Sequence, residues 1–313
     1  MYNQAQLAAD ELRQGLKSAL WPGQPDRRPA RGEVLDRKVY DDVIVEDLVL
    51  TSPQNPADPI PAYLTRPRGA SGRLPALICL HGTRRNRDFL VEERYWFERD
   101  KAKLHGWARE LARRGFATLG ITQRCHDGRV VPNIWEWAKK EQLRGRTAMG
   151  GLVEDAICAV DYLADQCPDV DPARIGMAGF SLGGIVTFYT TVADPRIRAA
   201  APACGAVGSL EALIDHGKTE FHSTYYYVPG LLRVGDHADL TRAIAPRALL
   251  ILAADRDDGM PLDGIRDLEA KGRVTYAGLG RADAFAVRIE AGDHNFTPDM
   301  LDGMVKWFGT NLG

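Results

Sequence analysis

The most informative part of this 313-residue sequence reads Arg174-Ile-Gly-Met-Ala-Gly-Phe-Ser-Leu-Gly-Gly184. Its first half is a short apolar run, as in a buried strand, and the residues that follow, 184–192, have the pattern of a helix. A turn that passes directly from strand to helix needs glycines where side chains would clash, and it lifts a serine hydroxyl above the sheet edge. The Gly-x-Ser-x-Gly pentapeptide at 179–183 therefore predicts that Ser181 is a nucleophile. The alternative is a structural serine in a tight turn.

A serine hydroxyl needs an adjacent base, and the base needs a group that orients it. The apolar run 285–290 leads into Ala-Gly-Asp-His at 291–294, so His294 should lie on a loop at a strand end. The run 248–254 leads into three carboxylates, of which we choose Asp257 because its loop must reach across to the histidine. Asp255 and Asp258 are then solvated turn residues. The predicted triad is Ser181, Asp257 and His294, in the chain order Ser, Asp, His.

The other histidines are assigned to packing or to the surface. We expect a helix around His105, an insertion around His216, His222 and His237, and no strand-end setting for His126.

Acyl transfer also needs amide donors aimed at the developing oxyanion, each worth roughly 3 kcal/mol. The apolar run 74–80 ends in His81-Gly82-Thr83. We assign the two donors to the backbone N–H groups of Thr83 and Leu182, and we expect His81 to hold the loop rather than to transfer protons. The alternative is that His81-Gly82 is an ordinary turn.

The pattern of the chain favours a doubly wound α/β architecture. Antiparallel strands are expected at 38–51 and 59–65, joined by the proline-rich turn 52–59. After them, strands and helices alternate, which is typical of a mostly parallel sheet buried on both faces. The strands are expected at 74–80, 116–121, 174–179, 198–202, 248–253 and 285–290, and the helices at about 102–114, 150–165, 182–193, 262–271 and 298–310.

The chain divides into an N-terminal helical extension, 1–34, and one domain, 35–313. Apolar residues at helical spacing predict an amphipathic helix over 3–20, and both packing on the core and a homodimer contact are open for it. Two stretches, 123–150 and 205–240, break the alternation and are expected to be lid-like insertions. Their aromatic residues either line a substrate pocket or pack in the core. These are Trp135, Trp137, Phe221 and Tyr225 to Tyr227, and the candidate pocket residues chosen from them are Trp135, Trp137, Phe221 and Tyr226.

The composition narrows the classes of partner. Forty Lys and Arg against 42 Asp and Glu give no global reason to expect nucleic acid or an anionic membrane. No apolar run approaches the roughly 18 residues of a membrane span, and the N-terminus lacks a secretory segment, so a cytoplasmic protein is expected. Five scattered cysteines without a Cys-x-x-Cys pair indicate reduced thiols rather than disulfides or zinc. We expect neither a cofactor nor a metal.

Taken together, these motifs resemble the α/β-hydrolase superfamily, and within it the branch around dienelactone hydrolases, acetyl xylan esterases and prolyl-oligopeptidase-like hydrolases. The likeness covers 38–313 and includes the segments 170–176 and 245–250 beside the triad motifs. Two departures stand out. Dienelactone hydrolases have a cysteine where this chain has Ser181, and the superfamily often has glycine where Ala254 stands.

The resemblance implies hydrolysis of a small-molecule carboxylic ester, with deacetylation of small or sugar esters as one form of it, through an acyl-enzyme. One alternative keeps the triad for peptide cleavage or acyl transfer. Another, from a different class, is a non-catalytic ligand-binding protein on the same fold.

Overall fold

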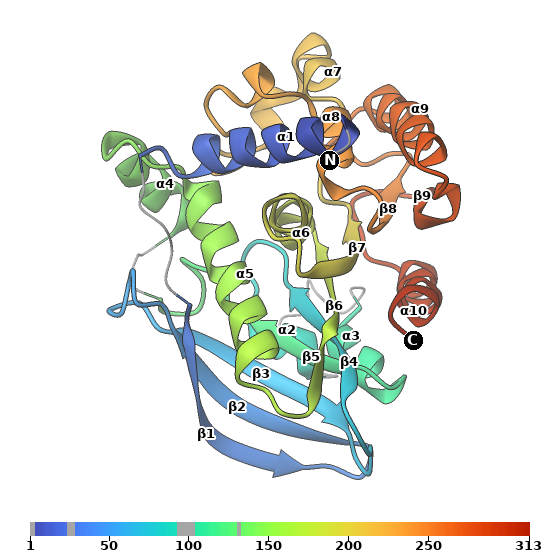
Figure 1. The fold of residues 1–313 in the computed structure, drawn as a ribbon. Helices are drawn as coiled ribbons and strands as arrows, with labels where there is room; N and C mark the ends of the chain where they lie inside the picture. Colours follow the sequence, from blue (N-terminus) through green and yellow to red (C-terminus); the bar gives the residue numbers. More distant parts are fainter. Residues whose placement is uncertain (1–3, 24–28, 93–103, 130–132) are drawn as a thin grey trace.

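The computed structural model describes residues 4–23, 29–92, 104–129 and 133–313. Its centre is a nine-stranded sheet in the order β1-β2-β3-β5-β4-β6-β7-β8-β9 (Figure 1). The pairs from β1 to β5 along this order are antiparallel, and those from β5 to β9 are parallel. The strands are β1 Arg31–Val39, β2 Val43–Thr51, β3 Ile60–Pro67, β4 Leu74–Leu80, β5 Ala117–Ile121, β6 Val170–Phe180, β7 Ile197–Ala203, β8 Ala248–Ala254 and β9 Phe285–Glu290.

Helices cover both faces of this sheet, with α3 and α10 on one face and α5 and α6 on the other (Figure 1). Every residue of β5 and of β8 is buried, as expected for strands covered on both sides. The doubly wound α/β prediction is confirmed. The helices are α1 Gln4–Leu20, α2 Arg87–Val91, α3 Trp107–Arg113, α4 Ile134–Leu143, α5 Ala148–Asp165, α6 Leu182–Ala193, α7 Leu210–Asp215, α8 His237–Ile244, α9 Leu262–Gly278 and α10 Pro298–Leu312, with short 3₁₀ turns η2 Lys218–Phe221, η3 Leu231–Arg233 and η4 Ala282–Ala284.

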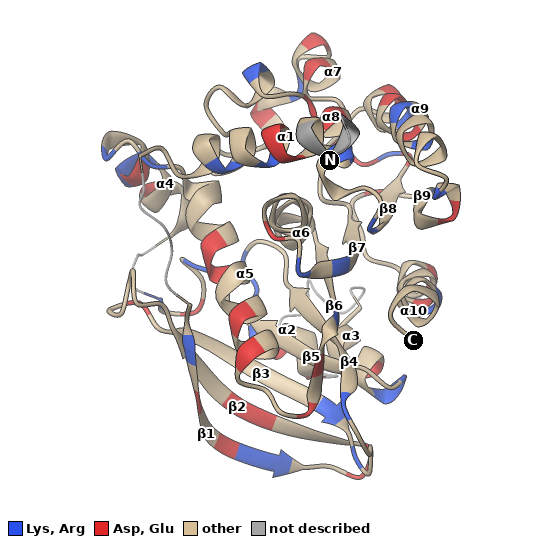
Figure 2. Ribbon diagram, viewed as in Figure 1, with Lys and Arg blue, Asp and Glu red and all other residues tan. Residues whose placement is uncertain are grey.

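The antiparallel hairpin is confirmed as β2 and β3, but the structure adds β1, which the sequence pattern missed. The predicted strand over 38–51 wrongly joined the end of β1 to β2. Strand β1 is exposed along almost its whole length and carries charges of both signs (Figure 2). Its sequence therefore lacks the alternation of apolar and polar residues by which a strand is predicted. Charged side chains on an edge strand oppose pairing with other chains. The border predicted at 34/35 falls inside β1, and the division into domains stays a prediction.

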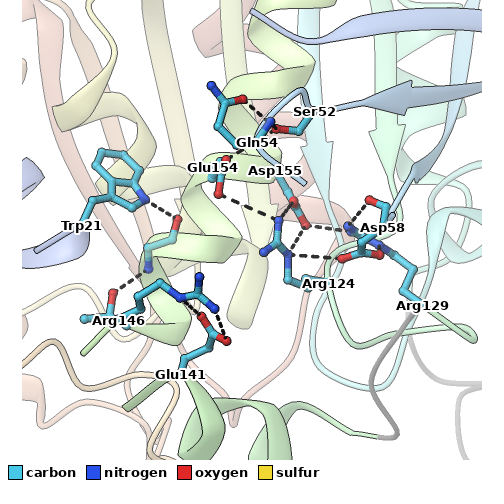
Figure 3. A network of polar contacts seen from close by, with 12 residues as sticks. Trp21, Ser52, Gln54, Asp58, Arg124, Arg129, Glu141, Arg146, Glu154 and Asp155 are labelled. Atoms are coloured by element: carbon cyan, nitrogen blue, oxygen red, sulfur yellow. Dashed lines mark hydrogen bonds and ion pairs between the residues drawn. The ribbon is translucent and has the colours of Figure 1, made fainter. Parts of the chain in front are cut away.

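Helix α1 packs on the core. Its residues Leu12, Leu16 and Leu20 are buried, and α1 lies across α8 and α6 (Figure 1). The Arg13 guanidinium donates to two backbone carbonyl oxygens, one from α6 (3.1 Å) and one from α8 (2.8 Å). The indole N–H of Trp21, just after α1, donates to the Gly150 carbonyl at 2.9 Å (Figure 3). The helix predicted over 3–20 is thus observed from Gln4, residue 3 lying outside the described part, and the homodimer stays a prediction.

The helix predicted over 102–114 begins later than expected. Residues 102 and 103 lie outside the described part, and α3 begins at Trp107, directly after Gly106 in the left-handed conformation (φ 66°). His105 therefore precedes the helix, contrary to the prediction.

The insertion 123–150 contains α4, and the insertion 205–240 contains α7, η2, η3 and the start of α8. Among the described residues, no helix combines the length and the apolar character that crossing a membrane requires.

Candidate active site

Ser181 occupies a strained turn between β6 and α6. Its backbone has φ 56° and ψ −118°, a conformation that non-glycine residues rarely adopt. The glycines of the motif make the turn possible. A Cβ on Gly179 would lie 2.2 Å from the Gly183 carbonyl oxygen, and a Cβ on Gly183 would lie 2.3 Å from the Leu80 carbonyl oxygen. The serine is therefore held at the carboxyl end of β6, close to the end of β4.

We expect Gly183→Ala to destabilise the protein by about 1–3 kcal/mol, because the new methyl group would push the elbow away from β4. Chemical denaturation measures this change. Gly309→Ala is the matched control: Gly309 lies in α10 with no atom near a built Cβ, so the same substitution should be neutral or stabilise by up to about 1 kcal/mol. Equal effects of the two substitutions would contradict the steric account.

The structure brings the three predicted triad residues together. Ser181 Oγ lies 2.9 Å from His294 Nε2, and His294 Nδ1 lies 2.8 Å from an Asp257 carboxylate oxygen. The three residues follow β6, β9 and β8, whose carboxyl ends meet at one edge of the sheet. With Nδ1–H donating to Asp257, Nε2 is free to accept the serine proton. This arrangement is able to activate a hydroxyl for attack on a carbonyl carbon.

Asp257 is held as a carboxylate. Its side chain is 6% exposed, and it also accepts the Gly259 N–H at 2.8 Å. Burial alone raises the pKa of Asp257, but the hydrogen bonds from His294 and Gly259 lower it overall. The neighbouring carboxylates differ, since Asp255 accepts the Gly292 N–H at 2.8 Å and Asp258 pairs with a lysine at the surface. Of the three, only Asp257 contacts the histidine in this structure.

His81 fixes the end of β4 from inside the protein. Its Nδ1–H donates to the Gly82 carbonyl at 2.8 Å, and its Nε2 accepts the Gln123 N–H at 3.0 Å. Burial holds the pKa of His81 well below its ordinary value, so the ring is neutral. A Cβ on Gly82 would lie 3.3 Å from the Ser181 Cβ, which places the next residue, Thr83, beside the serine. The role of Gln123 in this contact was not predicted, because no sequence pattern marks it.

The two backbone N–H groups chosen as oxyanion donors flank the serine. Leu182 is the first residue of α6, so its N–H has no acceptor within the helix. The Thr83 side chain is anchored by a 3.1 Å hydrogen bond between its hydroxyl and that of Tyr225, one of the aromatic residues of the insertion 205–240. The role of both N–H groups as donors to an oxyanion stays a prediction.

The four aromatic residues proposed for a substrate pocket lie in different places. Trp135 lines a pocket together with Thr83, and the Phe221 ring lies 6.4 Å from the His294 ring. Trp137 is buried, and its ring lies under the Arg124 guanidinium at 5.5 Å. Tyr226 is also buried, and it lines an apolar cavity of about 470 Å³ to which no triad residue contributes. Only Trp135 and Phe221 are thus near the proposed chemistry.

The remaining histidines make contacts of their own. The His222 ring N–H donates to the Gly259 carbonyl (2.6 Å), His216 pairs with an exposed carboxylate, and the buried His237 contacts a tyrosine hydroxyl (2.8 Å). His126 does follow a strand, because it lies in the loop after β5 and lines the pocket beside Thr83. The prediction that it lacks a strand-end setting was wrong. The loop is compact enough to bring a residue five positions past the strand back to the sheet edge.

All five cysteines are buried and free. In the part of the chain that the structure describes, one group of three potential metal ligands comes within 4.8 Å: Cys204, Asp257 and His294. These atoms already hydrogen-bond to one another or to backbone, with Cys204 donating to the Asn295 carbonyl (3.4 Å). Burial and the Asp257 carboxylate raise the pKa of the Cys204 thiol, so the thiolate that a metal prefers is disfavoured.

Comparison with known proteins agrees with this architecture. No family model matches the chain. A curated relative from Bacillus subtilis, "Putative hydrolase YtaP", is 31% identical over 274 residues, covering 86% of this chain and 89% of the relative. The glucuronoyl esterase from Solibacter usitatus superposes with a TM-score of 0.75 at 15% identity, over 97% of this chain and 92% of that structure. The acetyl xylan esterase from Paenibacillus sp. R4 gives 0.62 at 18%, over 98% and 94%. These solved structures share the fold.

Proposed function

Because the chain belongs to the α/β-hydrolase superfamily, we propose that it is a serine hydrolase that cleaves carboxylic esters. The observation that carries the proposal is the unbroken chain of hydrogen bonds from Asp257 through His294 to Ser181. The hydrolase name of the Bacillus subtilis relative and the esterase names of the structural neighbours support it. The substrate is a small-molecule ester, and the cytoplasmic location stays a prediction from the sequence.

The reaction follows from the positions of the side chains. His294 accepts the Ser181 proton as Oγ attacks the carbonyl carbon, and the N–H groups of Thr83 and Leu182 stabilise the oxyanion. Collapse of the tetrahedral intermediate breaks the ester bond, and His294 gives its proton to the departing alcohol. Water then attacks the acyl-enzyme by the same route, with His294 again as base, and releases the acid. Asp257 keeps the imidazole in the required tautomer and stabilises its protonated form.

A fluorophosphonate probe tests the assignment of the nucleophile. The folded protein should be labelled at Ser181, mapped by mass spectrometry, and protein unfolded in urea should not be labelled, because only the assembled triad activates the hydroxyl. Ser71→Ala, which removes an exposed loop serine, should label like the wild type. Folded protein that stays unlabelled, or that is labelled at another serine, would refute the proposal.

A further inference from the structure

A pocket of about 260 Å³ opens beside Thr83, and the triad does not account for its walls. Two stretches of the chain build its described walls, the loop after β4 and the insertion 123–150 with the start of α4. Its lining residues are Thr83, Arg84, Arg85, Asn86, Cys125, His126, Asp127, Asn133, Ile134 and Trp135. Because Gly82 packs directly against Ser181, a molecule in this pocket lies next to the carbonyl group that Ser181 would attack. The chemistry of the pocket therefore bears on which ester is bound.

Arg84 is the exposed cation of this pocket. Its guanidinium carbon lies 5.3 Å from the centre of the Trp135 ring. Stacking on an aromatic ring uses the face of a guanidinium and leaves its N–H edges free for a planar, two-oxygen acceptor. Among the described residues, no carboxylate is paired with this side chain. Arg84 also has a left-handed backbone (φ 62°), a conformation that non-glycine residues retain mostly where the surrounding structure enforces it.

The other charged side chains in the described part of the lining already have partners. Arg85 is buried, and its guanidinium donates to the Arg84 carbonyl (3.0 Å). Asp127 is the acidic side chain among the described lining residues, and it accepts the Asn86 amide at 3.1 Å. His126 is neutral, because burial lowers its pKa. Among the described lining residues, Arg84 is thus the cation whose N–H edges stay free for an anion.

We propose that this pocket binds a carboxylate carried by the ester substrate, with Arg84 as its partner and Trp135 holding the guanidinium in place. Arg84 is thus a specificity-determining residue, and the inference rests on the proposed esterase function. The preferred substrates are esters that retain one free carboxylate on the acyl or the alcohol side. Neutral esters of the same size lack the group that the guanidinium binds.

Two matched pairs of probes test this on the full chain. In the first pair, monomethyl glutarate carries a carboxylate on the acyl side and dimethyl glutarate does not. In the second pair, 4-acetoxybenzoate carries a carboxylate on the alcohol side and its methyl ester does not. We expect kcat/KM to be about 10-fold or more higher for the charged member of at least one pair. Arg84→Gln should remove this preference while leaving the neutral esters within about 2-fold, and Arg84→Lys should restore part of it. Added salt should shrink the preference.

The control is Arg144→Gln, which removes an exposed arginine of the same insertion, at the end of α4 and outside the pocket. The Arg144→Gln variant should prefer the charged esters over the neutral esters as strongly as the wild type does. Hydrolysis of both members of each pair at equal rates, or a preference that persists in Arg84→Gln, would overturn the carboxylate site and leave the esterase proposal standing. A wild-type protein that hydrolyses none of the four esters and resists the fluorophosphonate would overturn both.

Discussion

Ser181→Ala is expected to lower kcat for ester hydrolysis by roughly 10⁴- to 10⁶-fold, because the variant lacks the oxygen that attacks the carbonyl carbon. The free energy of unfolding should change by less than about 1 kcal/mol, since the substitution removes one hydroxyl at a partly exposed position. Initial rates on a short-chain nitrophenyl ester and a urea titration measure the two quantities. Ser71→Ala, at an exposed loop, should change neither.

The hydrogen bond between Ser181 and His294 adds a stricter expectation. If both residues serve the same step, His294→Ala should cost about as much as Ser181→Ala, and the double variant should lose little more than either alone. Effects that multiply in the double variant would mean that the two residues act independently. A Ser181→Ala protein with rates near those of the wild type would remove the nucleophile and the mechanism with it.

The site could be predicted from sequence where local geometry forces the residue type. The elbow around Ser181 needs glycines at fixed positions, because a side chain on Gly179 or Gly183 would overlap backbone atoms. His294 and Asp257 each follow an apolar run, and the carboxyl ends of parallel strands share one edge of the sheet. Strand boundaries were predicted correctly at both ends for β4 and β9, which are marked by apolar runs, and worst in the exposed edge strand β1.

The pocket beside Thr83 could not be predicted, because its described walls come from the loop after β4 and from the insertion 123–150, which meet only in the folded chain. Arg84 stood next to a predicted oxyanion donor, but nothing in the sequence shows that its guanidinium meets the Trp135 ring. The aromatic residues of the insertions look alike in sequence. Which of them are buried depends on long-range packing, so the sequence left open whether Trp137 and Tyr226 line a pocket or pack in the core, and both are buried.

A buried cluster of charged residues holds both ends of the loop that lines the pocket beside Thr83. No sequence pattern predicted this cluster. Asp155 of α5 receives hydrogen bonds from Arg124 (2.6 Å) and Arg129 (2.7 Å), and Arg129 also binds Asp58 in the turn between β2 and β3 (2.9 Å; Figure 3). The two arginines bracket the loop that carries three lining residues of the pocket. The side chains of Asp155 and Arg129 are 0% and 2% exposed, so water cannot replace a lost partner.

Asp155→Asn is therefore expected to destabilise the protein by about 3–5 kcal/mol, because two buried guanidinium groups lose their shared counter-charge. Catalysis should also weaken, since the same loop begins at Gln123, whose N–H holds His81. Urea titration measures the loss of stability. The matched control is Asp267→Asn, which removes a surface carboxylate paired with Lys271 in α9 and should cost less than about 0.5 kcal/mol. Equal effects of the two substitutions would contradict the structural role of the cluster.

The pH dependence of the unfolding free energy shows whether Asp155→Asn acts by removing a charge or by disturbing the packing around it. Burial alone raises the pKa of Asp155, but the two arginines outweigh it, so the pKa in the folded protein lies below the ordinary value of 3.8. The carboxylate therefore contributes stability that is complete above the pKa of the unfolded chain and is lost as the pH falls through the lower, folded-state pKa. The asparagine variant lacks this contribution at every pH. The difference in unfolding free energy between the wild type and Asp155→Asn should thus be constant near neutrality and should narrow once the pH falls below about 4. A gap that stays constant into acid would mean that the amide disrupts packing and that the ion pairs contribute little.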